Sequence, residues 1–125
     1  MSVLIVDDEY YIREVLIAFL LDAGYDATGA RNGRDAVDYL HQHPERFRLI
    51  LLDVMMPYMS GWELLETIRD DPAFATLPVI LMTAAENVHQ KAIEHGATDY
   101  LPKPIDLDEL LDIVEYYHVD DQREA

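Results

Sequence analysis

Four short apolar segments of the chain each lead into residues whose side chains could handle a phosphate group or a metal ion. Asp7 and Asp8 follow the first segment, Asp53 follows the second, and Thr83 ends the third. Lys103 comes just after the fourth segment. Three carboxylates brought together would repel one another unless a cation neutralised them. Mg2+ suits such a set, because it prefers oxygen ligands and usually binds one or two carboxylates together with phosphate oxygens.

The same residue types suit phosphoryl transfer. An aspartate can attack a phosphoryl donor to give an aspartyl phosphate, and the protein then positions the reactants and neutralises the phosphoryl oxygens. Lys103 would offer a cation to one of these oxygens and Thr83 a hydroxyl to another, with Mg2+ on the third. Taken singly, each residue has a simpler explanation as a turn former, a helix cap or a solvated surface charge. Their joint occurrence at the ends of four segments favours a shared site.

The segments that carry these residues alternate between strand-like and helix-like patterns. Continuous apolar runs are typical of strands buried on both faces, and weaker strand patterns accompany them; together they cover residues 3–6, 25–30, 49–52, 79–82 and 98–101. Apolar stripes with helical spacing follow four of them, at residues 12–19, 33–40, 64–68 and 107–114. The remaining helix, predicted at about residues 87–95, has the weakest periodicity. Gly24 and Gly96 stand where left-handed caps would end two of the helices.

This alternation predicts an α/β fold with a parallel sheet covered by helices on both faces. Ligands of such sheets bind beyond the carboxyl ends of the strands, so the strand-end residues should converge at one edge. Capping-box patterns mark the start of two helices, at Ser60 with Glu63 and at Asp106 with Glu109. We expect the last helix to fray after Asp120.

Composition excludes several classes of protein. Nine basic and 25 acidic residues leave a net charge of −16 on 125 residues, and half of the chain is hydrophobic. We predict one domain, residues 1–119, followed by an acidic tail at 120–125. The charge argues against direct nucleic-acid binding and favours divalent cations. The chain contains no cysteine, and its longest apolar run, residues 15–21, is too short to span a membrane, so we expect a cytoplasmic protein without membrane contact.

The order and spacing of the motifs resemble those of the receiver domain of two-component response regulators. The stretches that carry the resemblance are residues 3–9 (VLIVDDE), 51–57 (LLDVMMP) with Gly61, 81–84 (LMTA) and 100–104 (YLPKP). The resemblance covers the whole chain. It implies a flavodoxin-like (βα)5 fold, a doubly wound parallel sheet of five strands in the order 2-1-3-4-5.

The resemblance also implies a role for each site residue. Asp53 would be the phosphoacceptor, taking a phosphoryl group from a histidine kinase or a histidine phosphotransfer protein. Mg2+ would be the cofactor, bound directly by Asp8, through water by Asp7, and by Asp53. The backbone carbonyl of Met55 would complete the protein ligands of the metal.

A second group of residues would stabilise and report the phosphorylated state. In the family, residues at the positions of Thr83 and Lys103 contact the phosphoryl group and have the catalytic roles. Thr83 and Tyr100 would form the switch: the hydroxyl moves toward the phosphoryl group, and the aromatic ring swings inward. This alters the face made by the fourth helix, fifth strand and fifth helix, where a downstream protein target or an output domain would bind. The resemblance also allows a phosphorylation-dependent homodimer and a cis peptide bond between Lys103 and Pro104.

Other functions remain open at this point. A haloacid-dehalogenase-like phosphatase also uses a strand-end aspartate, magnesium and a lysine, but its usual Asp-x-Asp pair is absent, because Val54 and Met55 follow Asp53. A binding module with the same fold and no phosphoryl transfer is the second alternative, and the intact acids with Lys103 argue against it. A receiver domain would assist only its own phosphorylation and dephosphorylation, so we do not expect an ordinary metabolic enzyme. The sequence does not choose between a stand-alone regulator and part of a longer protein.

Three aromatic residues have two interpretations. Tyr10, Tyr11 and Trp62 could form an exposed docking patch or could pack at the boundary of the core. Packing is slightly favoured.

Overall fold

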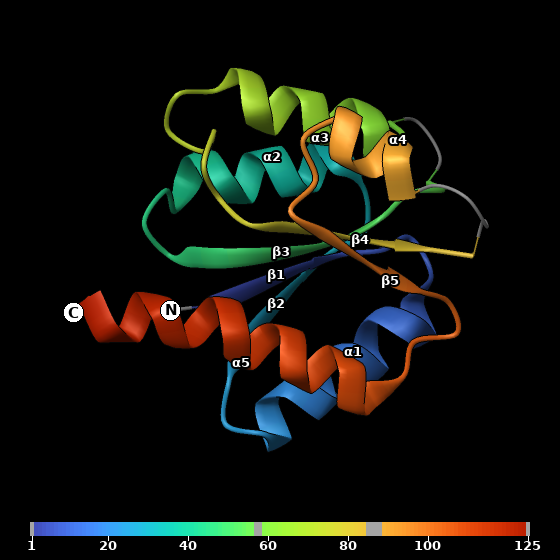
Figure 1. Ribbon diagram of the computed structural model, residues 1–125, viewed down its shortest axis with the longest axis vertical. Coiled ribbons are helices and arrows are strands. Elements are labelled where there is room, and N and C mark those ends of the chain that lie inside the picture. The colour runs from blue at the N-terminus through green and yellow to red at the C-terminus, as the bar shows by residue number, and fades with distance from the viewer. Residues whose placement is uncertain (1, 57–58, 85–88, 125) are drawn as a thin grey trace.

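The computed structural model describes the backbone of residues 2–56, 59–84 and 89–124, with the side chains of all but residues 89 and 118–124. In this part of the chain, five strands alternate with five helices (Figure 1). The strands are β1 (Ser2–Val6), β2 (Asp26–Ala30), β3 (Phe47–Asp53), β4 (Val79–Thr83) and β5 (Asp99–Pro102). The helices are α1 (Tyr10–Asp22), α2 (Gly33–Gln42), α3 (Gly61–Asp70), α4 (His89–Glu94) and α5 (Leu107–Glu124).

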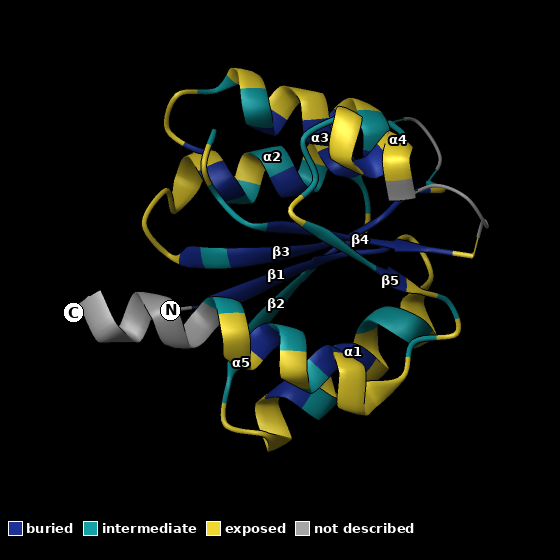
Figure 2. Ribbon diagram, viewed as in Figure 1, coloured by how far each residue is buried: buried dark blue, intermediate teal, exposed yellow. Residues whose placement is uncertain are grey.

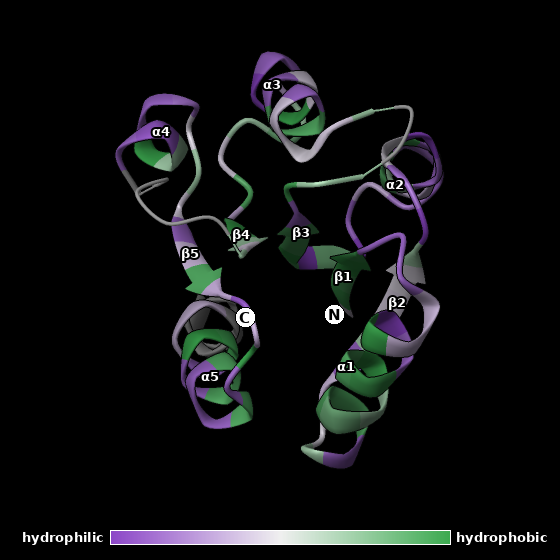
Figure 3. Ribbon diagram, turned by 90° about the vertical axis from the view of Figure 1, so that its right-hand side faces the viewer, coloured by the Kyte–Doolittle hydropathy of each residue, from purple (hydrophilic) through white to green (hydrophobic). Residues whose placement is uncertain are grey.

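The strands form one parallel sheet in the order β2-β1-β3-β4-β5. Helices α1 and α5 cover one face, and α2, α3 and α4 cover the other (Figures 1 and 3). The predicted (βα)5 fold and its strand order are therefore confirmed. Because every strand runs in the same direction, all the carboxyl ends lie at one edge of the sheet.

The central strands are buried on both faces, which explains their uninterrupted apolar sequences (Figure 2). Leu4 and Val6 of β1 belong to the apolar cluster beneath α2, α3 and α4. Val3 and Ile5 of the same strand belong to the cluster beneath α1 and α5. Each fully buried side chain of this kind contributes about 1.5–3 kcal/mol relative to an exposed one. The two clusters make the sheet a rigid support for the residues at its edge.

Side-chain caps start α3 and α5 where the sequence predicts them. The Oγ of Ser60 accepts a hydrogen bond from the N–H of Glu63 at 3.3 Å. Asp106 Oδ1 accepts one from the N–H of Glu109 at 3.2 Å. Each cap satisfies a backbone donor that has no partner inside the helix.

Two glycines end helices α1 and α4 in the left-handed region, as predicted. Gly24 has φ +95° and Gly96 has φ +91°. After Gly24, the N–H of Tyr25 donates to the carbonyl of Leu20 at 2.9 Å, a bond typical of the Schellman motif. Because residues with a side chain rarely adopt these φ values, glycine is the natural residue at both positions.

Strand β3 and helix α5 extend beyond their predicted boundaries. β3 begins at Phe47, earlier than expected, because this buried residue pairs with Ser2 across a register shift. α5 extends to Glu124, although we expected fraying after Asp120; no Gly or Pro interrupts the helix before its end. The predicted start of α4 near Asn87 lies outside the described residues. Among the described helices, none combines the length and the apolar character needed to cross a membrane.

Arg69 joins two loops at the opposite edge of the sheet, where the strands begin. Its Nε donates to the carbonyl of Gly96 at 2.8 Å, and its Nη1 donates to the carbonyl of Leu77 at 2.8 Å. Leu77 lies just before β4 and Gly96 just before β5. The guanidinium of α3 therefore holds the two connections that lead into these strands.

Candidate functional site

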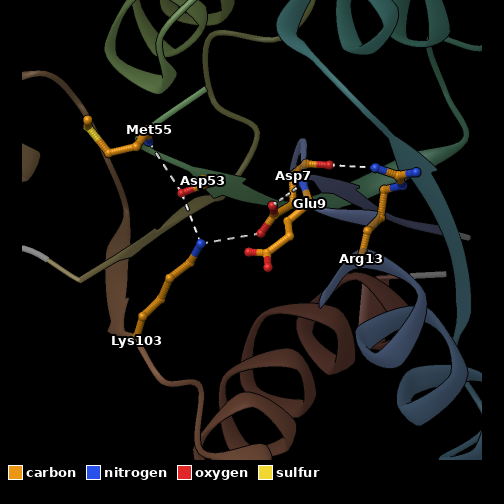
Figure 4. Close-up of polar contacts among 6 residues, drawn as sticks. All are labelled: Asp7, Glu9, Arg13, Asp53, Met55 and Lys103. Atoms are coloured by element: carbon orange, nitrogen blue, oxygen red, sulfur yellow. Dashed lines mark hydrogen bonds and ion pairs between the residues drawn. The ribbon is translucent and has the colours of Figure 1, made fainter. Parts of the chain in front are cut away.

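Lys103 lies between two buried carboxylates at the carboxyl edge of the sheet. Its Nζ is 3.1 Å from Asp53 Oδ1 and 3.4 Å from Asp7 Oδ2 (Figure 4). Asp7 is 0% exposed and Asp53 only 4% exposed. Asp7 follows β1, Asp53 ends β3, and Lys103 follows β5, so the parallel sheet brings together residues that are far apart in the sequence.

Asp8 adds a third carboxylate to this cluster. Carboxylate oxygens of Asp7, Asp8 and Asp53 all lie within 4.8 Å of one another. Asp8 is exposed, whereas the other two acids are buried. One lysine neutralises at most one of three negative charges, and the excess negative charge favours a cation. The donor set consists of hard carboxylate oxygens, which fits Mg2+ rather than a metal that prefers nitrogen or sulfur.

The surroundings of Asp53 raise the pKa of its carboxyl group from 3.8 to about 6. Burial is the largest cause, and the negative charge of Asp7 is the second. Lys103 and the N–H of Met55, which is 3.3 Å from Asp53 Oδ1, act in the opposite direction. These surroundings therefore disfavour the ionised form of Asp53, and a cation bound beside it would reverse this effect.

Lys103 stays charged in this environment. Burial by itself would lower the pKa of its ammonium group. The charges of Asp7 and Asp53, together with hydrogen bonds to both, outweigh burial and raise that pKa. Lys103 can thus neutralise an anion at the site over the whole physiological pH range.

Gly61 allows α3 to pack directly against the backbone of Asp53. A Cβ atom at position 61 would lie 2.4 Å from the carbonyl oxygen of Asp53 and 2.7 Å from the Cα of Val54. The N–H of Gly61 also donates to the carbonyl of Val54 at 2.9 Å. The glycine of the sequence motif is thus explained by close backbone approach, because any side chain would push α3 away from Asp53.

Thr83 and Tyr100 lie on β4 and β5, the two strands that follow β3 in the sheet. Thr83, only 3% exposed, ends β4, and its carbonyl accepts a hydrogen bond from the N–H of Lys103 at 2.8 Å. Tyr100 is partly buried on β5 and packs against the apolar cluster beneath α2, α3 and α4. Tyr100 therefore lies on the strand that leads to Lys103, and Thr83 is bonded to the main chain of Lys103 from the neighbouring strand. The Lys103–Pro104 peptide bond is cis, as the resemblance implies.

Met55 takes part in the site through its backbone. Its side chain is 78% exposed and turns away from the acids, whereas its N–H faces Asp53 (Figure 4). Met55 also lines an open recess at the mouth of the site, together with Asp8, Glu9, Tyr10, Tyr11, Asp53, Ala84 and Lys103. The acidic cluster is therefore accessible from solvent.

The aromatic residues divide between the two interpretations left open by the sequence. Tyr10 and Tyr11 are 59% and 78% exposed, so packing is the wrong interpretation for them. Trp62 is partly buried between α3 and α4, with Lys91 Nζ 4.6 Å and the His95 ring 5.1 Å from its ring centroid. Packing is the correct interpretation for Trp62.

Arg13 is a residue of this region that the sequence analysis did not identify. Its Nη1 donates to the carbonyl oxygen of Asp7 at 2.8 Å (Figure 4). The only sequence signal is a basic residue on the first turn of α1, shortly after the acidic pair. Such a residue is indistinguishable from a solvated surface charge until the helix is placed against the sheet.

Comparisons with known proteins concern the family and the fold of the chain. The family model described as "Response regulator receiver domain" matches residues 3–115. The chain is 39% identical to the transcriptional regulatory protein CrdR of Helicobacter pylori, covering 96% of this chain and 56% of that protein. It is 39% identical to the response regulator Rre1 of Synechocystis, covering 90% of this chain and 49% of that protein. The chain thus spans about half the length of these two relatives.

Two further comparisons concern smaller proteins. An uncharacterized 14.6 kDa protein of Leptolyngbya boryana is 40% identical over 94% of this chain and 89% of its own length. The solved structure of chemotaxis response regulator CheY4 of Vibrio cholerae matches with a TM-score of 0.85 at 32% identity, covering 93% of this chain and 97% of that one.

Proposed function

The chain belongs to the family of response regulator receiver domains, the phosphorylation-dependent switches of two-component signalling, and we propose that Asp53 is its phosphoacceptor. The observation that carries this proposal is the placement of Asp53. Its carboxylate is buried at the end of a central strand, 3.1 Å from the ammonium of Lys103, and lines a recess that opens to solvent. In this position the Asp53 carboxylate can be reached by a phosphoryl donor through the recess, and the ammonium of Lys103 already lies beside it.

The proposed reaction transfers a phosphoryl group from a phosphohistidine. A carboxylate oxygen of Asp53 attacks the phosphorus atom, an O–P bond forms, and the P–N bond to the donor imidazole breaks with its electron pair left on nitrogen. The donor is a histidine kinase or a histidine phosphotransfer protein. Lys103 would neutralise one phosphoryl oxygen, and the hydroxyl of Thr83 would donate to another. Like other receivers, the domain would assist only its own phosphorylation and dephosphorylation.

Magnesium is the proposed cofactor. Asp7, Asp8 and Asp53 would hold it with the backbone carbonyl of Met55. The close approach of the three carboxylates and their excess of negative charge support this assignment. When bound, the ion supplies positive charge to the phosphoryl oxygens and favours the ionised form of the acids.

The output is proposed to pass through Thr83 and Tyr100. Their positions support this role. Thr83 ends β4 beside Lys103, and Tyr100 lies three residues before Lys103 on β5, the outermost strand of the sheet. A shift of the hydroxyl toward the phosphoryl group would open space into which the ring moves. The face of α4, β5 and α5 would then bind a downstream protein or output domain. Pairing of two phosphorylated copies and a cytoplasmic location remain predictions.

Intact mass after incubation with acetyl phosphate and Mg2+ tests the proposal. We expect one phosphoryl adduct on the native chain and none on Asp53→Asn. Asp38→Asn is the matched control, because it makes the same change at an exposed residue of α2 and should leave the adduct in place.

The other outcomes support the two alternative functions. No adduct on the native chain, even with rapid sampling, would favour a binding module with the same fold. Sustained hydrolysis of a small phosphate ester would favour a phosphatase.

A further inference from the structure

Arg13 and Lys103 hold the end of β1 from two sides. Lys103 contacts the carboxylate of Asp7 at 3.4 Å, and Arg13 contacts the carbonyl of the same residue at 2.8 Å. Figure 4 shows the two cations flanking Asp7, with Lys103 toward Asp53 and Arg13 on the side away from it. The two contacts differ in kind, because Lys103 pairs with a charge and Arg13 with the main chain.

The bond from Arg13 acts on the peptide unit that joins Asp7 to Asp8. This unit is planar, so the direction of the Asp7 carbonyl sets the orientation of the whole plane. The N–H of Asp7 is held by the carbonyl of Ala30 at 3.1 Å, and the N–H of Glu9 by Asp7 Oδ1 at 2.9 Å. With the Arg13 bond, the main chain is therefore held before, within and after the acidic pair.

Strand β2 leaves space for the Arg13 side chain. A Cβ atom at Gly29 would lie 2.9 Å from Arg13 Cδ, 3.1 Å from Arg13 Cγ and 2.8 Å from Ile17 Cδ1. Gly29 pairs with Ile5 of β1, so this contact lies directly beside the strand that carries the acids. A glycine within a strand is typical of such a close approach. The arginine stem therefore crosses β2 where no side chain stands.

We propose that Arg13 is a positioning residue for the cation site: it orients the Asp7–Asp8 peptide so that both carboxylates face the site together with Asp53. The inference rests on the proposed function, because it assumes that the acidic cluster binds Mg2+. A guanidinium suits this role, since it is always charged and its donors have a fixed geometry.

The direction in which the Mg2+ affinity changes when Arg13 is replaced distinguishes a positioning role from an effect of its positive charge alone. A cation near the site repels Mg2+, so removal of the Arg13 charge alone would tighten Mg2+ binding. Removal of a positioning contact would weaken it, because the carboxylates would have to be reoriented when the ion binds. Loss of groups that orient metal ligands typically weakens metal binding about 10- to 100-fold.

The test is the Kd for Mg2+, measured by isothermal titration calorimetry on the full chain. We expect Arg13→Met to raise Kd about tenfold, at the lower end of that range. Gly29→Ala should also raise Kd, because its methyl group displaces the arginine stem while the charge remains. Arg31→Met is the matched control: it removes a cation that is 74% exposed and pairs with Asp35, and Kd should stay within about twofold of native.

A second readout is the Mg2+ concentration that gives half of the maximal Asp53 adduct. Arg13→Met should raise it by the same factor as Kd, whereas the adduct at saturating Mg2+ should equal that of the native chain. The double variant Arg13→Met with Gly29→Ala should bind Mg2+ no more weakly than Arg13→Met alone, because both substitutions remove the same contact. If Arg13→Met does not fold, Gly29→Ala provides the same test from β2.

Several results would overturn the inference. An unchanged or lower Kd for Mg2+ in both Arg13→Met and Gly29→Ala would overturn it. This also holds if the melting temperatures of the variants fall, because the bond from Arg13 to the Asp7 carbonyl would then contribute to stability alone. A native chain that binds no Mg2+ would overturn both this inference and the proposed magnesium site. Normal Mg2+ binding and adduct formation by the native chain, with no change in the variants, would contradict the inference alone.

Discussion

Lys103 and Arg69 are both partly buried cations that join distant segments, at opposite edges of the same sheet. Lys103 contacts two carboxylates at the edge where the strands end. Arg69 contacts main-chain carbonyl oxygens at the edge where strands begin, including those of Leu77 and Gly96. Burial acts on both cations, yet the pKa of Lys103 is raised and that of Arg69 is lowered.

The difference lies in what surrounds each charge. Around Lys103, the acids carry more negative charge than the lysine can neutralise, and the cluster adjoins an open recess. Around Arg69, the partners are neutral dipoles that belong to the loops being held. Charges near solvent can exchange one partner for another, so the first edge can bind a cation or a phosphoryl group. The carbonyls around Arg69 are main-chain groups that already accept hydrogen bonds from the guanidinium and carry no net charge, so we interpret the second edge as structural.

The largest effect that tests this comparison is expected at Arg69. Arg69→Met should lower the free energy of unfolding by about 3–4 kcal/mol, because it leaves several partly buried carbonyls without their charged donor. Urea denaturation measures the loss, and Arg34→Met on the exposed side of α2 is the control. Folded Arg69→Met protein should still form the Asp53 adduct. A loss below about 1 kcal/mol would contradict a structural role.

A smaller loss is expected at Lys103. Without Mg2+, Lys103→Met should lower the free energy of unfolding by about 2 kcal/mol, since Asp7 and Asp53 are left without their cation and protonation limits the cost. Saturating Mg2+ should then raise the melting temperature of the variant more than that of the native chain, because the ion no longer competes with the lysine. Equal Mg2+ shifts in both proteins would mean that Lys103 and the metal do not share the acids.

Asp53→Asn should change stability in the opposite direction. The raised pKa of Asp53 means that the carboxyl group favours the folded state below pH 3.8, and this contribution is lost as pH rises through about 6. A shift of about two units corresponds to about 3 kcal/mol, and loss of the bond to Lys103 offsets part of it. We expect the variant to be about 1–2 kcal/mol more stable than the native chain at pH 7.5 without Mg2+, and not more stable at pH 4. Equal stability differences at both pH values would contradict the shift.

The rate of phosphorylation by acetyl phosphate should follow the same ionisation. With Mg2+ well below saturation, the initial rate of adduct formation should rise about tenfold between pH 5 and pH 7, because the ionised carboxylate is the proposed nucleophile. Saturating Mg2+ should move the midpoint to lower pH, since the cation favours the ionised form. Intact mass at short times measures both profiles. A flat profile at low Mg2+ would show that Asp53 ionises at its ordinary pKa.

Much of the fold and of the acidic cluster could be predicted from the sequence, because the patterns that indicate them involve residues close together along the chain. Buried strands such as 3–6 and 79–82 are uninterrupted apolar runs, and caps such as Ser60 and Asp106 involve residues a few positions apart. Because parallel strands end at one edge, the order of the segments was enough to bring Asp7, Asp53 and Lys103 together. None of these inferences depends on how a helix is rotated against the sheet.

The tertiary structure decided what depends on packing between distant segments. The sequence determined that Gly61, Arg13 and Arg69 were present. It did not determine that a Cβ at Gly61 would lie 2.4 Å from the carbonyl oxygen of Asp53, or that the two arginines would meet main-chain carbonyls. It also could not set the pKa of Asp53, because the balance between burial, Asp7 and Lys103 varies with separations in space. Periodicity along the chain records which residues face a core, whereas contact and electrostatic energies depend on distances that exist only after the helices have packed.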